Sequence, residues 1–583
     1  MANFLNHYML KYTPLSPLHI GTGDSYEPTN YVIDDGTLYE FDTGAALAAL
    51  SANDRTELLK ITGGKPDTQM LKALQKFFYD RRNALKPWSV HAIPVLEGVA
   101  GLYQSRIGQS ANREGGGGQV INRLEIDRTA YNPINRQPIL FGSSIKGAIR
   151  TALLNHVNKG QSLSKQDADW FKIDDLDKYE RRRYGREQKK VYSRLNERLF
   201  KFRAGKFELD PMRLLHVSDA AWINHENLPT AQVLITVNRK KHKVTNAHGS
   251  ELLSQAEKKE NLCKLLECVP PWHYRVFAGG LNIQLLNKLH AKNDDRLPHD
   301  DLRFSMKQIA KACCAFYLPI LKAEMTLMRG RGFLDNEWDK NIQALLANMA
   351  DKMQTGQIFL LRIGRHSGAE AVTLSGARNI KIIKGNPEYQ EQTKTLWLSA
   401  EQPKQRSGLL PFGWVLVEVE SKGVPANDWP ELAELCYKQQ AKARQWADKH
   451  NEQKAELEQI RLEALQRRKR EETERILRTK RAQQEEQERL AKEHADQLRR
   501  AAMTPEQLQI DALKLMLRRK QASNLREQVG GPLYSDLREM IKQTEAWPGD
   551  AKAELLEVAK ELLTFIGASS NKKAKELLKI LQQ

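Results

Sequence analysis

The sequence is poor in cysteine: it has five among 583 residues, and no two of them form a Cys-x-x-Cys pair. So few cysteines, in an odd number, argue against a disulfide framework. Cys263 and Cys268 lie in a stretch that reads as a helix, and no second pair of ligands follows that would complete a zinc site. We therefore expect buried or inert thiols, with no metal and no cofactor.

The sequence also lacks the motifs of common enzyme classes and any long apolar run. It contains no Walker A loop, no Gly-x-Gly-x-x-Gly, no His-Glu-x-x-His and no Gly-x-Ser-x-Gly. Its first residues, MANFLNHY, do not read as a signal peptide, and no run approaches the length of a membrane span. These absences predict a cytoplasmic protein without a recognisable catalytic centre.

Two places could still carry chemistry. Asp34 and Asp35 sit where a strand is expected to end, and turn formation is the ordinary role of such a pair. His19 precedes a Gly-rich turn, where a histidine can act as an acid or base but more often has a structural role.

What the sequence has in excess is positive charge. Lys and Arg number 91 against 72 Asp and Glu, a formal net charge of +19. Such a surplus favours polyanionic partners through counterion release, but it does not choose between RNA, DNA and anionic lipid. A merely soluble basic protein is the alternative.

The chain changes character near residues 429–436. Before this point, short strand-like runs alternate with helices and many Gly and Pro, which favours an α+β fold over a doubly wound parallel sheet. Strands are predicted at residues 8–12, 31–33, 38–41, 233–237, 281–285, 358–363, 377–383 and 414–419. Helices are predicted at residues 44–49, 66–84, 144–156, 250–268, 302–323 and 336–353.

After this point the sequence is helical and highly charged. Residues 441–503 contain no Gly and no Pro and too few apolar positions for a coiled-coil seam, which predicts a long solvated helix or spacer. Thr504, Pro505 and Glu506 then start a new helix, and amphipathic segments follow at residues 508–529, 532–545, 550–565 and 571–581. We predict four parts: residues 1–240, 241–435, 436–503 and 504–583.

The most informative stretch is ILFGSSIKGAIRTALL, residues 139–154. A short apolar run ends at Gly142, and Ser143 or Ser144 can cap a helix that carries Lys146 and Arg150. Free N–H groups, the helix dipole and two cations would together form an anion site. The alternative is a capped surface helix with solvated cations.

Other basic segments point to nucleic acid. Residues 180–206 interleave cations with Tyr and Phe, which suits a flexible RNA strand. Residues 238–243 (NRKKHK) and 363–368 (IGRHSG) each follow an apolar strand. The loop at residues 106–129 contains four consecutive glycines and would be either a disordered tether or a basic finger that orders on a ligand.

Four passages, taken together, resemble one family. They are LSPLHIGTGD (15–24) with YVID (31–34), FGSSIKGAIRTALL (141–154), LLHVSD (214–219), and FLLRIGRHSG (359–368) with LPFGWVLV (410–417). Their set resembles the RAMP superfamily of CRISPR proteins, and their order is most similar to the fifth Csm subunit of type III-A effector complexes. The resemblance covers roughly residues 1–420, and the tail has no counterpart in the family pattern.

The resemblance implies ferredoxin-like, RRM-type domains with Gly-rich loops, here residues 1–240 with inserted basic finger loops and residues 241–435. It implies a type III subunit that binds guide RNA, caps the backbone filament near the crRNA 3′ end, supports crRNA maturation and antiviral defence, and has no established catalytic centre. The implied partners are the guide RNA, other Csm backbone and small subunits, cellular nucleases that trim the crRNA 3′ end, and nearby target RNA, with no membrane.

The residues predicted to contact or shape the RNA site come from the same passages and the basic segments. They are His19, Gly21, Gly23, Arg123, Arg128, Gly142, Ser143, Ser144, Lys146, Gly147, Arg150, Arg239, Lys240, Lys241, Arg362, Gly364, Arg365, His366 and Gly368.

Three alternatives stay open. The chain could be a metal-independent CRISPR RNA-processing endonuclease of the same superfamily that uses His19 or His366 as acid or base. It could be a different RAMP backbone subunit of a type III complex. It could also be a helical adaptor in which the tail is the working part and RNA binding is incidental.

Overall fold

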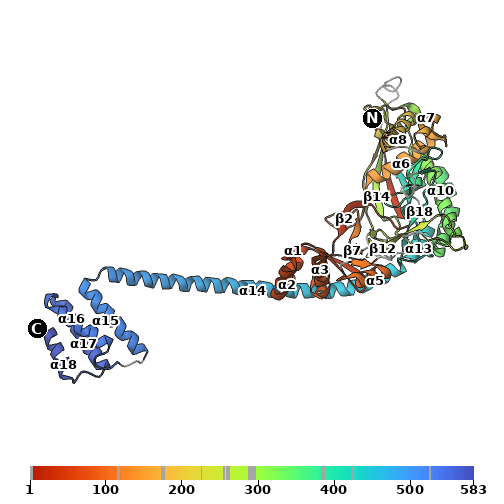
Figure 1. Ribbon diagram of the computed structural model, residues 1–583. Coiled ribbons are helices and arrows are strands. Elements are labelled where there is room, and N and C mark those ends of the chain that lie inside the picture. Colours follow the sequence, from red (N-terminus) through yellow and green to blue (C-terminus); the bar gives the residue numbers. More distant parts are fainter. Residues whose placement is uncertain are drawn as a thin grey trace. The chain divides into compact units, whose positions relative to one another are not determined.

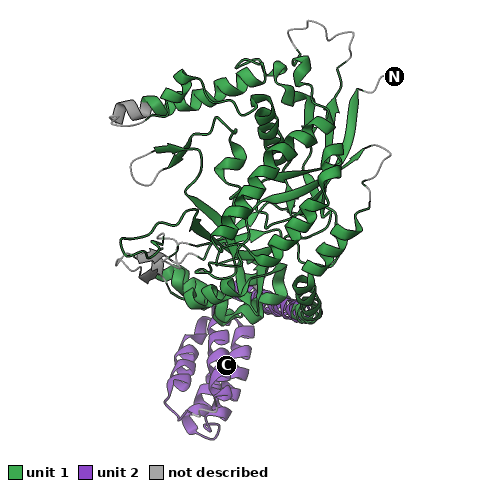
Figure 2. Cartoon of the chain, turned by 90° about the vertical axis from the view of Figure 1, so that its right-hand side faces the viewer, with its two compact units in different colours: residues 1–464 green, residues 465–583 purple. Residues whose placement is uncertain are grey.

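The computed structural model describes residues 4–109, 111–113, 119–121, 124–172, 178–224, 226–253, 257, 263–286, 297–382, 388–421, 426, 428–523 and 527–583. The chain divides into two compact units, Met1–Ala464 and Leu465–Gln583 (Figure 2). The first unit holds the sheets, and the second consists of helices.

A seven-stranded sheet forms the centre of the first unit. Its order is β15-β19-β1-β14-β11-β9, with β10 also paired to β14, and these pairings are antiparallel. The strands are β1 (Leu5–Pro14), β9 (Ile139–Leu140), β10 (Leu215–Val217), β11 (Ala220–Trp222), β14 (Phe277–Gln284), β15 (Ile358–Arg362) and β19 (Trp414–Ser421). The helices α6 (Gly142–Asn158) and α10 (Met306–Gly330) contact each other and this sheet.

The chain order within this sheet is that of a ferredoxin-like fold. β1, α6, β10 with β11, β14, α10 and β19 follow one another as βαββαβ. The strands lie as β19-β1-β14-β11, which is the spatial order 4-1-3-2, and β15 and β9 extend the two edges. The predicted α+β, RRM-type class is therefore confirmed.

Two further sheets complete the first unit. One has the order β18-β12-β13-β8-β2, and the other has the order β3-β4-β5. Their strands are β2 (Gly21–Tyr26), β3 (Tyr31–Asp34), β4 (Thr37–Phe41), β5 (Ser89–Pro94), β8 (Ile126–Thr129), β12 (Gln232–Lys240), β13 (Lys264–Cys268) and β18 (Thr395–Ala400). The seven-stranded sheet and the five-stranded sheet each combine strands from before and after residue 240. The sheets therefore do not mark a boundary there, and the predicted division at residue 240 stays a prediction.

Further α-helices and two small ribbons belong to the first unit. The helices are α1 (Thr43–Ala49), α2 (Ala52–Thr62), α3 (Thr68–Asp80), α4 (Arg82–Leu85), α5 (Glu97–Arg106), α7 (Lys165–Asp169), α8 (Lys178–Leu199), α11 (Asn336–Ala347), α12 (Ala350–Thr355) and α13 (Pro430–Gln439). Two small antiparallel ribbons are β6 (Ala111–Arg113) with β7 (Gln119–Ile121), and β16 (Ile380–Ile382) with β17 (Glu388–Gln390).

One predicted element is of the wrong type. The predicted helix at residues 250–268 ends instead in the strand β13, whose Leu266 and Cys268 are fully buried. A short apolar run fits a buried strand as well as a helix, which explains the error. Residues 180–206, whose interleaved cations and aromatic residues predict an RNA contact, lie mostly in the helix α8.

The C-terminal helices are confirmed. α14 (Ala441–Ala501) is one uninterrupted helix (Figure 1). Its first turns pack within the first unit, where Trp446 Nε1 donates to Thr37 Oγ1 at 3.0 Å, whereas every residue from 469 to 502 is exposed. In the second unit, α15 (Pro505–Ala522), α16 (Pro532–Gln543), α17 (Gly549–Phe565) and α18 (Lys572–Gln582) enclose a separate apolar core. Thr504 caps α15, as predicted.

Candidate nucleic-acid interface

Three passages far apart in the sequence line one open groove of about 640 Å³ in the first unit. The turn before β2, the first turns of α6 and the loop after β15 each contribute to it. The lining residues among those predicted are Gly21, Ser143, Ser144, Gly147, Arg362, Gly364 and Arg365. The structure thus brings together residues from three of the four passages on which the sequence prediction rests.

The loop after β15 is held against the turn before β2 by backbone contacts. Arg365 N donates to His19 O at 2.8 Å. Gly364 has φ +83°, and a Cβ at this position would clash with the same carbonyl oxygen. Only glycine combines a positive φ with so close an approach, so this residue fixes one wall of the groove.

The opposite wall is the beginning of α6. The helix starts at Gly142 with Phe141 in the N-cap position and no side-chain cap, so the predicted serine cap is wrong. Gly142 N instead donates to Asp219 Oδ1 at 2.7 Å, and a Cβ on Gly142 would clash with Val217 O. The chain's own carboxylate therefore occupies the first N–H of the helix, while Ser143 one residue further on is exposed.

Comparison with known proteins identifies the family. Residues 11–368, more than half of the chain, match the RAMP superfamily. The chain belongs to the RAMP superfamily. None of the curated proteins compared with it matches.

Two solved structures share features with this RAMP chain. The cryo-EM structure of a Csm-crRNA-target RNA ternary complex of a type III-A CRISPR-Cas system contains a chain with 18% identity and a TM-score of 0.40, over 71% of this chain and 100% of that one. The crystal structure of T. onnurineus Csm5 has 18% identity and a TM-score of 0.38, over 70% of this chain and 99% of that one.

Arg365 is the partly exposed cation in the groove lining of this RAMP protein. Its side chain is 33% exposed and pairs with Asp127. Lys146 is half-buried, and burial lowers the pKa of its ammonium against the opposing effect of Asp210. Arg150 Nη1 is paired with Asp210 Oδ2 at 2.7 Å. Arg365 and Arg150 are therefore shared with carboxylates of the chain itself.

Four other predicted contacts are instead buried cations, at most 6% exposed: Arg128, Arg239, Lys241 and Arg362. Strand-end cations were expected to face solvent, and the sequence gives no signal of partners so far away along the chain. Because carboxylates or carbonyls inside the protein bind these four side chains, we leave them out of the proposed RNA surface, including Arg362, which lines the groove.

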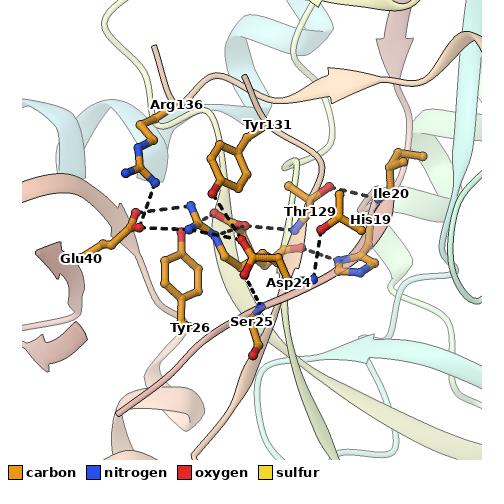
Figure 3. Close-up of polar contacts among 12 residues, drawn as sticks. His19, Ile20, Asp24, Ser25, Tyr26, Glu40, Thr129, Tyr131 and Arg136 are labelled. Carbon is orange, nitrogen blue, oxygen red and sulfur yellow. Dashed lines mark hydrogen bonds and ion pairs between the residues drawn. The ribbon is translucent and has the colours of Figure 1, made fainter. Parts of the chain in front are cut away.

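The partners of the four buried cations are specific. Arg128 donates to both carboxylate oxygens of Glu40, at 3.0 and 3.3 Å. Glu40 also accepts from Arg136 at 2.9 Å, as Figure 3 shows. Lys241 pairs with Glu370 at 2.6 Å, and Arg362 pairs with Glu324 at 2.8 Å. Arg239 Nη1 donates to Asn238 O at 3.1 Å, and its Nε donates to Gln405 O at 3.2 Å.

The two histidines considered as acid or base are turned into the protein. His19 is 1% exposed, its Nδ1 lies 2.7 Å from Glu267 O, and burial lowers its pKa. The His366 ring stacks on Trp397 at 5.0 Å between centroids, and burial, together with nearby Arg365, lowers its pKa to about 3. Both imidazoles are neutral at physiological pH.

Asp34 is also bound by groups of the fold. It accepts hydrogen bonds from Arg82 at 3.0 Å and Lys86 at 2.6 Å. Burial acts to raise the pKa of this carboxyl, but the two cations outweigh burial and hold the pKa below its usual value. A carboxylate held by two cations of its own fold is a structural group here.

The remaining predicted positions lie outside the groove lining. Gly23 and Gly368 are exposed turn residues with φ +85° and +78°, and Lys240 donates to Leu252 O at 2.9 Å. Arg123 and the glycines at 115–118 lie outside the described residues, while the flanking segments form the antiparallel ribbon β6–β7. Roles for these residues in RNA binding stay predictions.

Among the described residues there is neither a cluster of metal ligands nor a membrane-spanning helix. No group of three or more His, Cys, Asp or Glu side chains is placed to hold a metal ion. Within the same residues, no helix is both long and apolar enough to span a bilayer.

Proposed function

We propose that this RAMP protein is a guide-RNA-binding subunit of a type III CRISPR effector complex that caps the backbone filament near the crRNA 3′ end and supports crRNA maturation. The convergence of the turn before β2, the start of α6 and the loop after β15 on one groove carries this proposal. The net charge of +19 supports a polyanionic ligand.

The groove offers the groups that hold a phosphate backbone without reading bases. The hydroxyls of Ser143 and Ser144, in the first turn of α6, and the guanidinium of Arg365 line it together. Hydroxyls and arginines are usual phosphate ligands, and phosphate contacts carry no sequence information. This chemistry suits a guide whose sequence varies.

The proposed role is non-enzymatic. His19, His366 and Asp34 are held by groups of the fold, and none of them is among the residues that line the groove. We therefore propose that trimming of the crRNA is done by cellular nucleases, with other Csm subunits and nearby target RNA as the remaining partners.

Gly147 offers a direct test. It lies in the groove lining, and a Cβ at this position would meet no described atom within 4 Å, so a side chain can start here without a clash. Gly147→Glu places a carboxylate where a phosphate should lie. We expect it to weaken binding of fluorescein-labelled single-stranded RNA by about tenfold, because like charges in a partly shielded groove repel by a kcal/mol or more.

Two controls accompany this variant. Gly147→Gln has the same bulk without the charge and should bind nearly as the wild type does. Gly101→Glu adds the same charge at an exposed helical glycine of α5 that also has open space around it, and it should have little effect. Equal affinities for all four proteins would refute the groove assignment, and cleavage of repeat RNA in EDTA would favour the endonuclease alternative.

A further inference from the structure

The groove does not account for α8, the cation-rich helix between α6 and β10. Its apolar face is buried through Val191 and Leu195. Gln188 Nε2 donates to Trp170 O at 2.8 Å, and Tyr192 OH accepts from Asn379 N at 3.2 Å. Because separate segments hold it, the helix presents its other face in a fixed position.

That other face is strongly basic. Five cations are exposed along three turns, at spacings that place them on one side of the helix: Arg183, Arg186, Lys189, Lys190 and Arg194. Lys190 and Arg194 pair with Glu187 or Asp167. Among the described residues, Arg186 and Lys189 have no carboxylate partner, which leaves unneutralised charge at the centre of this face.

An aromatic pair borders the basic face. Trp170, at the end of α7, meets Tyr184 of α8 edge to face with 5.0 Å between ring centroids, and both side chains are only partly buried. The Arg183 guanidinium lies 5.9 Å from the Trp170 ring centroid. Rings of this kind stack on unpaired bases while neighbouring cations meet the phosphates.

We infer that the α8 face, defined by Arg183, Arg186, Lys189 and the Trp170–Tyr184 pair, binds a single-stranded RNA segment by stacking and charge. This inference rests on the proposed function, because it takes RNA as the ligand. The aromatic pair favours a single strand over a duplex, in which bases are not free to stack on side chains.

The two RNA surfaces belong to one continuous part of the first unit. The groove lies at the first turns of α6, and α8 contacts α6 (Figure 1). Near the other end of α6, Asn155 Oδ1 accepts from Ser375 N at 2.8 Å, close in the sequence to Asn379, which holds Tyr192. α6 has 17 residues and is about 25 Å long, so a strand of several nucleotides would reach from the groove to the α8 face.

The test uses the full chain and a fluorescein-labelled oligouridine, with an RNA duplex as the competing probe. We expect the triple variant Arg183→Glu, Arg186→Glu and Lys189→Glu to bind the single strand more weakly. The slope of log affinity against log salt should fall by about 2, since each phosphate contact on a single strand contributes about 0.7. The matched control reverses Arg475, Lys480 and Arg481, three exposed cations of α14, to Glu.

A second pair of variants tests stacking. Trp170→Ala should weaken binding of the single strand at least about fivefold, whereas Trp170→Phe, which keeps a ring, should largely retain it. A triple variant indistinguishable from the α14 control would overturn the inference. So would equal losses on strand and duplex together with no effect of Trp170→Ala.

The outcomes separate this inference from the proposed function. Loss of binding in Gly147→Glu with none in the α8 triple variant rejects the α8 face alone. Loss of binding in the α8 triple variant with none in Gly147→Glu rejects the groove and supports the α8 face.

Discussion

His273 illustrates how single buried residues set the response of the fold to pH. It is fully buried, its ring lies 5.4 Å from that of Trp222, and neither ring nitrogen has a hydrogen-bond partner among the residues that the structure describes. Burial lowers its pKa to about 4. The unfolded chain takes up this proton near pH 6.5, so the stability that the neutral ring provides is lost as pH falls from 6.5 toward 4.

We predict that His273→Phe flattens the loss of stability in acid. Phe keeps a ring beside Trp222 and cannot be protonated, and the wild-type penalty at pH 4 is on the order of 3 kcal/mol. Thermal midpoints at steps between pH 7 and pH 4 measure this difference, with the exposed His156→Gln as control. Parallel curves for His273→Phe and the wild type would contradict the prediction.

Glu267 changes the stability with pH in the direction opposite to that of His273. The prediction is therefore tested by comparing the His273→Phe curve with the wild-type curve. Burial raises the pKa of this carboxyl to about 7, against the opposing effect of Arg128. Its contribution to stability is therefore present at low pH and is lost as pH rises from about 4.5 through 7. The wild-type curve alone mixes both effects.

At the scale of elements, the loop after β15 depends on one glycine for its contact with the turn before β2. Gly364 combines a positive φ with a close approach to His19 O, whereas Gly23 has a similar φ and open space around it. The two glycines separate backbone strain from steric clash.

We predict that Gly23→Ala destabilises the protein by about 1 kcal/mol, which is the strain of a left-handed alanine. Gly364→Ala should destabilise it at least about twice as much, because the added Cβ must also push the loop away from residue 19. Thermal unfolding of the two variants side by side measures the difference. Equal shifts in midpoint would show that the loop moves freely.

The elements also show what the sequence could and could not predict. α14 and α15 were predictable because a stretch without Gly or Pro and a Thr-Pro start are local signals. The strand β13 was missed because its buried apolar residues have no period of their own. The pairing of Arg128, Lys241 and Arg362 with Glu40, Glu370 and Glu324 was missed because these partners meet only in the folded chain.

The same limit applies to the candidate site. Two of its three passages, residues 141–154 and 359–368, combine the end of an apolar run with glycine and cations. Residues 238–243, where Arg239 and Lys241 are buried, carry a similar local signal. Which of them share a groove depends on sheet order, and no single segment encodes this order. Asp219, the last residue of the passage at 214–219, accepts a hydrogen bond from Gly142 N at the start of α6. Nothing in the sequence predicts this contact.

At the scale of the whole molecule, each unit has apolar core residues of its own, drawn from separate parts of the chain. The core of the second unit draws on α15 to α18, whereas the first turns of α14 belong to the first unit. In the first unit Trp446 donates to Thr37, Lys449 pairs with Asp35 at 2.6 Å, and Leu457 packs against an apolar cluster.

We predict that residues 1–464 alone bind RNA with the affinity of the full chain. A chain that ends at residue 436 should unfold at a lower temperature, because it lacks the packing of Trp446 and Leu457. Fluorescence anisotropy and thermal unfolding of both truncations check this. Loss of RNA binding in residues 1–464 would favour the adaptor alternative, in which the tail is the working part.

The exposure of residues 469–502 of α14 has a consequence for how this stretch tolerates change. No side chain there fills a core, so substitutions are constrained by helix propensity and by neighbouring charges rather than by shape. Composition can therefore drift widely among charged and small residues while the helix persists. A glycine or a proline would destabilise the helix. A fluorescent label or an affinity tag could be attached at almost any position of this stretch without disturbing either unit.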